Sequence, residues 1–392
     1  MSTVILSAKR TPVGSFGGAL RDVRATELGR VASAAAIEAA GIERTEVDEV
    51  VFGSGGMPIA EANLARQVGL ALDLPVEVPA YSVQRNCASG IQAIVSGAQD
   101  IALGEARVVL AGGAESMSGA PYLLYGARWG MRLRHGEVRD GIWEGLTDYA
   151  TGLVMGETAE ILADDYGIER REMDELAVES HQKAFRASRS GRFKDEIAPV
   201  TIPARHGEAE VLHQDEGILA GLSVERLATA PATFRKGGRV TPGNSSALND
   251  AGAAVVLADQ DYARSRGLRP LARIVAHAFV GVDPRRMGLG PVGATRKALA
   301  RAHLELKDIG LIEINEAFAA QYLAVEREMG WDRAIVNVNG GALALGHPIG
   351  ATGVRLVTTL VHEMRRRSVR FGLATLCVGG GQGASLILEV TD

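Results

Sequence analysis

The chain carries an internal repeat, and a repeat of this kind limits the folds that the chain can adopt. Residues 36–53 read AIEAAGIERTEVDEVVFG, and residues 298–315, which lie 262 positions later (298 − 36), read ALARAHLELKDIGLIEIN. Each segment reads as an Ala-rich amphipathic helix, a polar turn and a short apolar strand. A second pair, VVLAGGAES at 108–116 and ATLCVGGGQ at 374–382, reads as buried strands that end in consecutive glycines. The two pairs predict two similar halves.

Each half contains further elements that fit this reading. An apolar strand opens each half, at Val4–Ala8 and Ala272–Ala276, and a helix is expected over about 90–104 and about 350–367. Short apolar runs that alternate with helices predict an α/β fold, with a mostly parallel or mixed sheet that is covered on both faces. Residues 119–245 have no counterpart. We interpret them as an insertion from the first half, and insertions of this size usually bind something.

The composition excludes several classes of protein. The chain has 42 basic and 47 acidic residues, a net charge of −5, which argues against a nucleic-acid surface. Glycine is frequent, at 48 of 392 residues, but has no period of three, so collagen is excluded and tight turns are expected. No apolar run reaches the roughly 18 residues of a membrane span. The first residues lack the h-region of a signal peptide, so none is expected. Two cysteines allow no disulfide framework, which indicates a reducing compartment, the cytoplasm.

Cys87 is the first candidate reactive residue. It lies in VQRNCASG, directly before a helical run. The positive end of a helix dipole lowers the pKa of a nearby thiol toward the nucleophilic thiolate. Small neighbours leave room for a substrate. The alternative is a buried structural cysteine, which is a common fate of a single cysteine.

Cys377 and His347 are the next candidates. Cys377 ends a strand before three glycines, in LCVGGGQG, where successive N–H groups can form an oxyanion or anion nest. The alternatives are a core cysteine and a phosphate loop, although no GxxxxGK[ST] pattern is present. His347 stands between Gly346 and Pro348, which suits a positioned base. Asn315 ends a second-half strand, where ligands gather in α/β folds. These side chains predict one pocket, and no CxxC or HExxH spacing indicates a metal.

At these residues the chain resembles a thiolase. The matching motifs follow the family order across nearly the whole chain: NCASG at Cys87, AGGAESMS at 111–118, MGETAE at 155–160, GNSSALNDAGAA at 243–254, GVDPRRMGLGP at 281–291, NEAFA at 315–319, GGALALGHPIGATG at 340–353 and CVGGGQG at 377–383. The resemblance implies two pseudo-repeated βαβαβαββ halves in a five-layer αβαβα arrangement with an inserted loop domain. We expect an N-terminal half at 1–118 plus 246–270, a loop domain for CoA binding and oligomer contacts at 119–245, and a C-terminal half at 271–392.

The resemblance also implies a reaction and residue roles. Thiolases condense two acetyl-CoA molecules, or cleave a 3-ketoacyl-CoA, through an acyl-thioester on the enzyme. Cys87 is then the nucleophile, His347 takes its proton, and Cys377 is the acid/base at the α-carbon. His347 and a water held by Asn315 form one oxyanion hole, and the N–H groups of Cys87 and Gly379 form the second. No cofactor is implied, because coenzyme A is a substrate and product.

By the same resemblance, the pantetheine arm of CoA runs past Met155, Ser246 and Phe318, with Met287 nearby; the alternative for the methionines is core packing. Val154 stands where several short-chain thiolases have a histidine, and GILAG follows Asp215-Glu216 where many have a His-Pro-Arg-like segment. The nucleotide contacts and the acyl-chain preference are therefore left open. Positive charge for the phosphates, or a solvated oligomer face, explains four arginines of the insertion: Arg128, Arg132, Arg134 and Arg139.

Three hypotheses for the function follow. The first is an acetyl-CoA C-acetyltransferase, with acetyl-CoA, coenzyme A and 3-ketoacyl-CoA as its small-molecule partners, no nucleic acid and no membrane, that forms a homo-oligomer, a dimer of dimers. A close variant is a longer-chain 3-ketoacyl-CoA thiolase of fatty-acid degradation. The second, of another class, is a non-catalytic acyl-CoA or lipid-binding protein, which the presence of Cys87, His347, Asn315 and Cys377 disfavours. The third, a decarboxylating ketoacyl synthase, normally has a histidine in place of Cys377.

Overall fold

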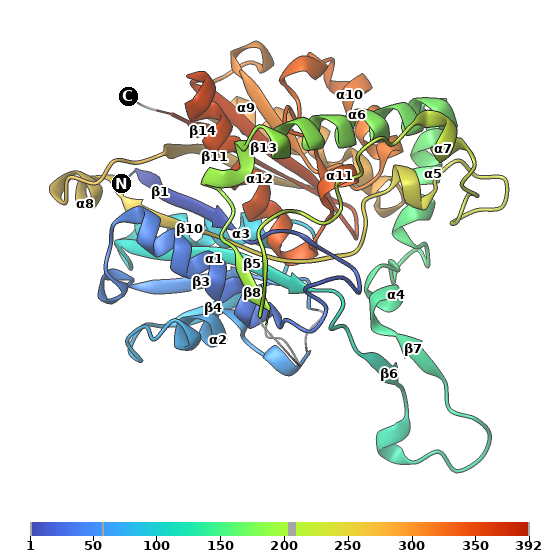
Figure 1. Cartoon of the computed structure of the whole chain (residues 1–392), viewed down its shortest axis with the longest axis horizontal. Coiled ribbons are helices and arrows are strands. Elements are labelled where there is room, and N and C mark those ends of the chain that lie inside the picture. Colours follow the sequence, from blue (N-terminus) through green and yellow to red (C-terminus); the bar gives the residue numbers. More distant parts are fainter. Residues whose placement is uncertain (1, 57–58, 203–208, 391–392) are drawn as a thin grey trace.

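One mixed sheet runs through the whole molecule (Figure 1). The computed structural model describes residues 2–56, 59–202 and 209–390; the remaining positions of the predicted domains, 1, 57–58, 203–208 and 391–392, lie outside the described residues. The strand order is β12-β13-β14-β11-β1-β10-β5-β3-β4, with β2 beside β10. The strands of this sheet are β1 (Thr3–Arg10), β2 (Gly14–Ser15), β3 (Glu49–Gly53), β4 (Ala80–Val83), β5 (Val108–Ser116), β10 (Asn249–Asp259), β11 (Ala272–Gly281), β12 (Leu311–Ile314), β13 (Phe371–Val378) and β14 (Gln382–Glu389).

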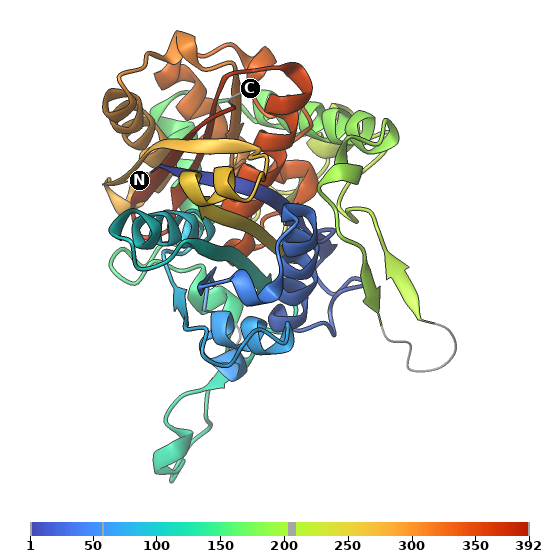
Figure 2. The ribbon, with the colours of Figure 1, turned by 90° about the vertical axis from the view of Figure 1, so that its left-hand side faces the viewer.

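Helices cover the outer faces of the two halves of this sheet, and two further helices fill the layer between the halves (Figures 1 and 2). The helices of the two halves are α1 (Ala25–Ala40), α2 (Leu64–Ala71), α3 (Ser89–Leu103), α8 (Gln260–Ser265), α9 (Gly290–Ala302), α10 (Ala319–Met329), α11 (Ala342–Leu345) and α12 (Ile349–Arg367). α3 and α12 pack against each other and against strands of both halves, and one apolar core unites them. α1 and α2 cover the outer face of the first half, and α9 covers that of the second, with α10 beside it. The layers follow the αβαβα order that the resemblance implied.

The internal repeat is confirmed down to its turns. α1 and α9 end 262 residues apart, at Ala40 and Ala302, and the next residues, Gly41 and His303, both adopt the left-handed conformation that ends helices. A capping box then opens a short turn in each half, formed by Glu43 with Glu46 and by Glu305 with Asp308. The polar residues between helix and strand therefore perform the same structural task twice.

The halves differ in one strand and in one alignment. The first half reads β1-α1-β3-α2-β4-α3-β5-β10, the predicted βαβαβαββ order, but in the second half the counterpart of β4 is a single bridge between Val336 and Ile312. The prediction that both segments of the second pair are strands that end in consecutive glycines is wrong for the first segment. Gly112 and Gly113 lie inside β5, whereas Gly379 begins the turn after β13. A side chain at Gly112 would overlap the ring of Phe52, because its Cβ would lie 2.3 Å from that ring.

The central helices approach each other through glycine. A Cβ on Gly353 of α12 would lie 2.4 Å from the backbone nitrogen of Ile91, and one on Gly90 of α3 would lie 2.7 Å from that of Val354. Real Cβ atoms do not come so close to backbone, so the two helices contact through their main chains here. This contact places the N-terminal ends of α3 and α12 side by side, directly after Cys87 and His347 in the chain.

The insertion connects β5 to β10, at the place where the second half has only the turn 379–381. Its elements are β6 (Tyr122–Leu124), β7 (Val138–Asp140), α4 (Gly141–Gly145), α5 (Met155–Asp165), α6 (Arg170–Arg189), β8 (Val200–Ile202), β9 (Glu210–Leu212) and α7 (Val224–Ala228). The hairpin of β6 and β7 projects from the body (Figures 1 and 2). α5 and α6 pack on α10, so the insertion leaves the first half and covers the second. None of the described helices is long and apolar enough to cross a membrane.

Candidate active site

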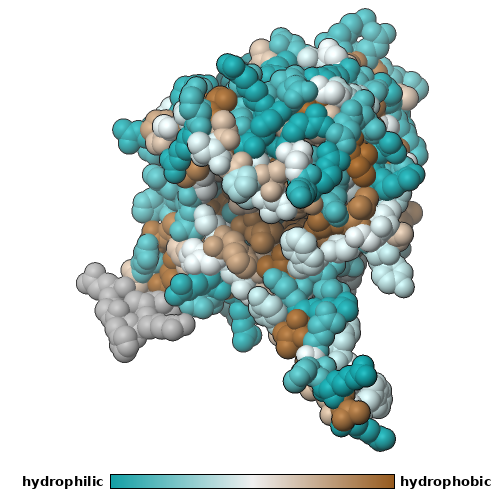
Figure 3. All heavy atoms as spheres, turned by 90° about the vertical axis from the view of Figure 1, so that its right-hand side faces the viewer, coloured by the Kyte–Doolittle hydropathy of each residue, from teal (hydrophilic) through white to brown (hydrophobic). Residues whose placement is uncertain are grey.

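Cys87 lies beside a cavity of about 170 Å³ between the two halves and the insertion. Its backbone precedes α3, and Asn86, held in the left-handed region at φ 42°, directs its side-chain amide to the carbonyl of Gly379 at 2.9 Å. The cavity is lined by residues of both halves and of the insertion: Gly55, Asn86, Cys87, Gly145, Leu146, Thr147, Asp148, Tyr149, Met155, Ile349, Gly379 and Gly380. Figure 3 shows apolar residues gathered between the main body and the hairpin on the face from which the hairpin projects.

The expectation that the helix lowers the pKa of the Cys87 thiol is wrong. Burial raises the pKa of Cys87, and the carboxylate of Glu115 raises it further. The nearby backbone N–H groups of Gly379 and of Cys87 itself act in the opposite direction, because they favour the negatively charged thiolate, but they do not outweigh the burial. In the resting protein Cys87 is therefore a thiol. Both N–H groups of the predicted second oxyanion hole lie at this sulfur.

The second cysteine lies close to the first. Cys377 is fully buried at the end of β13, and both cysteines are free of disulfides. Burial raises the pKa of the Cys377 thiol, and the neighbouring Cys87 raises it further. Such a thiol keeps its proton in the resting protein, and its thiolate, once formed, is a strong base.

His347 is buried just before α12, with its ring held in one tautomer. The hydroxyl of Thr352 donates to the carbonyl of Pro348 at 2.8 Å and lies 2.7 Å from Nδ1 of His347. Because this hydroxyl has a single proton, Nδ1–H of the ring donates to it, and Nε2 is left as an acceptor. Within the described part of the chain, Nε2 has no hydrogen-bond partner. Burial lowers the pKa of His347 to about 3, and the nearby Arg355 also lowers it, so the ring is a neutral base.

Asn315 follows β12 and is completely buried. Its backbone N–H donates to the carbonyl of Thr375 at 3.0 Å, which fixes its position beside β13. Neither its amide oxygen nor its amide nitrogen has a partner among the described residues. Burial of an unpaired amide is costly, so a polar ligand or a water fits this place. The role of Asn315 in holding a water stays a prediction, and its unpaired amide suits that role.

The four predicted CoA-arm residues fall into two groups. Met155, at the start of α5, lines the Cys87 cavity, and its sulfur would lie 3.2 Å from a Cβ on Gly379. Met287 and Phe318 belong to the buried core of the second half, and Phe318 packs against the ring of Phe234. The hydroxyl of Ser246 donates to the carbonyl of Ala317 at 3.0 Å. Only Met155 of the four lines this cavity.

The arginines of the insertion lie away from Cys87. Three of the four, Arg128, Arg132 and Arg134, are exposed between the two strands of the projecting hairpin. Arg139 lies on β7, where it pairs with Glu137 and Glu144. None of the four lines the Cys87 cavity, so their predicted contact with phosphates stays a prediction.

Some residues of the site escaped the sequence analysis. Asn249 joins three segments, because its amide accepts the His347 N–H at 3.0 Å and donates to the carbonyl of Gly14 at 2.9 Å. Thr352 fixes the histidine ring. Both residues lie inside the motifs quoted above. Thr352 lies only five residues after His347, and this short spacing is the signal that could have indicated its contact with the ring.

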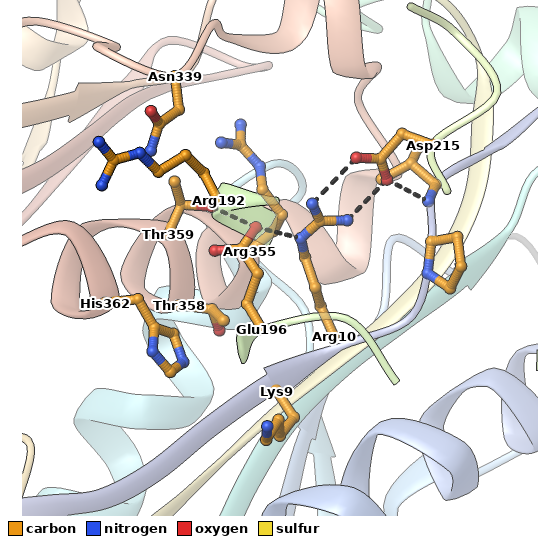
Figure 4. Close-up of polar contacts among 12 residues, drawn as sticks. Lys9, Arg10, Arg192, Glu196, Asp215, Asn339, Arg355, Thr358, Thr359 and His362 are labelled. Carbon is orange, nitrogen blue, oxygen red and sulfur yellow. Dashed lines mark hydrogen bonds and ion pairs between the residues drawn. The ribbon is translucent and has the colours of Figure 1, made fainter. Parts of the chain in front are cut away.

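A buried ionic network ties the insertion to the helix that follows His347. The guanidinium of Arg10 on β1 binds Asp215 through two nitrogens, at 2.7 and 3.0 Å, and Glu196 at 2.8 Å (Figure 4). Glu196 also accepts from Thr359 of α12 at 3.3 Å. Arg10 is 1% exposed, and the two carboxylates raise its pKa. Asp215 and Glu216, which directly precede the GILAG segment that departs from the family pattern, therefore anchor the insertion.

In the described residues, no group of three or more His, Cys, Asp or Glu side chains is arranged to hold a metal ion.

The family models for the thiolase N-terminal and C-terminal domains match residues 3–261 and 268–390. The acetyl-CoA acetyltransferase of Pseudomonas aeruginosa is 50% identical over 98% of either chain. The human mitochondrial 3-ketoacyl-CoA thiolase is 44% identical over 99% of this chain and 98% of its own.

Solved structures show the same relationship. The acetyl-CoA acetyltransferase of Bacillus anthracis matches with a TM-score of 0.98 and 49% identity, over 100% of this chain and 99% of that chain. A human mitochondrial 3-ketoacyl-CoA thiolase in complex with CoA matches with a TM-score of 0.95 and 42% identity, over 100% and 98%. With two family models that together span almost all of its length, the chain belongs to the thiolase family.

Proposed function

We propose that this chain is an acetyl-CoA C-acetyltransferase, which condenses two acetyl-CoA molecules to acetoacetyl-CoA and CoA and catalyses the reverse thiolysis. Relatives named acetyl-CoA acetyltransferase are 46–50% identical over almost the whole chain. The observation that carries the proposal is the Cys87 thiol, which lies at a cavity with two backbone N–H groups and a second thiol beside it. CoA is a substrate and product in this reaction.

The first half of the reaction transfers an acetyl group to Cys87. Nε2 of His347 takes the thiol proton, and the sulfur attacks the acetyl carbon. The N–H groups of Cys87 and Gly379 stabilise the oxyanion of the tetrahedral intermediate; loss of one such donor typically costs about 3–4 kcal/mol. The CoA sulfur leaves with the proton of Cys377. The products are acetyl-Cys87, a protonated His347, the Cys377 thiolate and free CoA.

The second half forms the carbon–carbon bond. The Cys377 thiolate takes a proton from the methyl group of a second acetyl-CoA, and protonated His347 and a water on Asn315 donate to the enolate oxygen. The enolate attacks acetyl-Cys87 and expels the cysteine sulfur. That sulfur recovers its proton from His347, so all three side chains return to their starting states.

Mass spectrometry of the protein after exposure to acetyl-CoA tests this function. We expect an added acetyl group on the peptide that holds Cys87, no acetyl group in Cys87→Ser, and a loss of both condensation and thiolysis in that variant. Retention of full activity by Cys87→Ser in both directions would exclude the covalent mechanism.

A longer-chain 3-ketoacyl-CoA thiolase is the second candidate. It is favoured by the 44% identity to the human mitochondrial 3-ketoacyl-CoA thiolase and by Val154 in place of the histidine of several short-chain thiolases. The cavity of about 170 Å³ favours a short acyl group. Thiolysis rates with acetoacetyl-CoA and with 3-ketoacyl-CoA of about 8–16 carbons decide between them, and a clear long-chain preference overturns the short-chain proposal.

We also propose that the insertion binds CoA and joins subunits into a dimer of dimers. The β6–β7 hairpin supports the second part, because it exposes large apolar side chains that a partner could cover: Tyr122, Leu124, Tyr125, Trp129, Met131, Leu133 and Val138. Light scattering of the intact protein should give a tetramer, and a chain whose residues 124–137 are replaced by a short glycine linker should give a smaller oligomer.

The predicted domain boundaries and the cytoplasmic location stay predictions.

A further inference from the structure

Glu115 is a buried carboxylate that the reaction above does not use. It is the penultimate residue of β5 and is 0% exposed. Its Oε2 accepts the backbone N–H of Gly55 at 2.5 Å and that of Gly350 at 2.9 Å. Gly350 belongs to the first turn of α12, whose N–H groups have no partner within the helix. One oxygen therefore joins a loop of the first half to the start of a helix of the second half.

Both segments held by Glu115 border Cys87. Gly55 and Ile349, the residue before Gly350, line the cavity together with Cys87. A Cβ on Gly55 would lie 2.5 Å from Oε2 of Glu115 and 2.9 Å from the side chain of Ile349, so these groups are in direct contact. Ile349 also packs against Met117 in a small apolar cluster that includes Cys87. A shift of Glu115 would therefore move the walls of the site.

The charged and titratable groups around Cys87 come from several elements. Asp148 in the loop before α5 lines the cavity and accepts from the N–H and hydroxyl of Thr151. Arg85 is engaged by Gln92 and Gln382. His347 and Cys377 are neutral at neutral pH, because burial lowers the pKa of the histidine and raises that of the thiol. Glu115 is the group whose charge raises the pKa of Cys87.

We infer that Glu115 is a positioning residue for the Cys87 site: its carboxylate holds the Gly55 loop against the first turn of α12 and places a negative charge near the nucleophile. This inference rests on the proposed role of Cys87. The charge opposes thiolate formation, and together with a neutral His347 it favours a resting pair of thiol and imidazole over a thiolate and an imidazolium. The proton then moves only when a bound thioester accepts the sulfur.

The pH dependence of cysteine alkylation tests the electrostatic part. Iodoacetamide reacts with thiolates, and peptide mass spectrometry separates Cys87 from Cys377. In Glu115→Gln, which keeps the size and one carbonyl oxygen, we expect the alkylation midpoint of Cys87 to fall to a lower pH than in wild type. Asp48→Asn is the matched control, because Asp48 also accepts two backbone N–H bonds, at 2.8 and 2.9 Å, but at the opposite end of β5. A midpoint in Glu115→Gln that equals the control overturns the inference.

A second variant tests the positioning part, and it keeps the proposal testable if Glu115→Gln fails to fold. Glu115→Asp keeps the charge but retracts it by one methylene, so that it no longer reaches both N–H groups. We expect faster amide hydrogen exchange in peptides that contain residues 55 and 350, a kcat lowered at least about tenfold, and an unchanged alkylation midpoint. Unchanged exchange at both glycines overturns the positioning role.

Alkylation and hydrogen exchange need no acetyl-CoA. If wild-type protein fails to accept an acetyl group on Cys87, the proposed function fails, while the midpoint and the exchange rates still report on Glu115. The two failures are therefore distinguishable.

Discussion

At the scale of single residues, the pKa of His347 makes a prediction about acid stability. Burial lowers it from 6.5 in the unfolded chain to about 3 in the folded protein. Below about pH 6.5 the unfolded chain therefore binds a proton that the folded protein does not, and stability falls until the pH reaches the folded value. Between pH 7 and pH 4 we expect wild type to lose about 3 kcal/mol more of its unfolding free energy than His347→Gln. Urea unfolding of both proteins measures the difference, and parallel pH curves would contradict it.

The hydroxyl that fixes the histidine tautomer makes a second prediction. Thr352→Val keeps the shape but removes the acceptor of Nδ1–H, which leaves the ring free to place its proton on Nε2. We expect kcat to fall by about 10²-fold with little change in KM. Thr358→Val is the matched control, because the Thr358 hydroxyl makes the same kind of bond to the carbonyl four residues earlier, at 2.9 Å, on the same helix. Equal activities of the two variants would show that the tautomer is not set in this way.

The sequence alone indicates a functional residue only where the neighbouring residues in the chain give a signal. Cys87 could be singled out because it lies before a helix among small residues, and Cys377 because a glycine-rich turn follows it; the structure brings the two together. Glu115 could not be assigned a role, because its partner at Gly350 lies 235 positions away and is a backbone group with no signature. The direction of the Cys87 pKa shift was wrong for a similar reason, since burial depends on what covers the thiol.

At the scale of elements, the crossing of α3 and α12 makes the third prediction. In Gly353→Ala the added methyl would meet backbone at 2.4 Å, and because backbone atoms cannot rotate away we expect a loss of about 3 kcal/mol. Gly69→Ala, inside α2, is the control, since its nearest neighbours are side chains at 3.7 Å. There the better helix propensity of alanine should stabilise by about 0.5–1 kcal/mol. Similar unfolding midpoints for the two variants would rule out the tight crossing.

Elements were more predictable than their alignment. The helices expected at about 90–104 and 350–367 are found at Ser89–Leu103 and Ile349–Arg367, because apolar periodicity is a local property. The glycine pair of β5 was misassigned to a strand end, since only the fold shows that Phe52 lies against it. The single bridge at Val336 was likewise hidden, because strand pairing depends on the partner strand.

At the scale of the whole molecule, the Arg10 network makes the last prediction. Arg10→Met leaves Glu196 and Asp215 buried without their cation, and we expect a loss of about 3–5 kcal/mol. Arg30→Met removes a pair between half-exposed side chains, Arg30 and Glu27, and should change stability by less than about 0.5 kcal/mol. Thermal unfolding compares the two. A triple variant that also carries Glu196→Gln and Asp215→Asn should recover much of the loss, and its failure to do so would show that packing against Phe193, rather than charge, is responsible.

The packing of α3 against α12 in the layer between the two halves has a consequence for synthesis on the ribosome. The chain leaves α3 at residue 103 and reaches α12 at residue 349, 246 positions later (349 − 103). At roughly 5–20 residues per second, this takes about 12–50 seconds. Throughout that delay the nascent first half displays an apolar surface whose cover has not yet been translated, so chaperone capture should be strongest before residue 349 emerges.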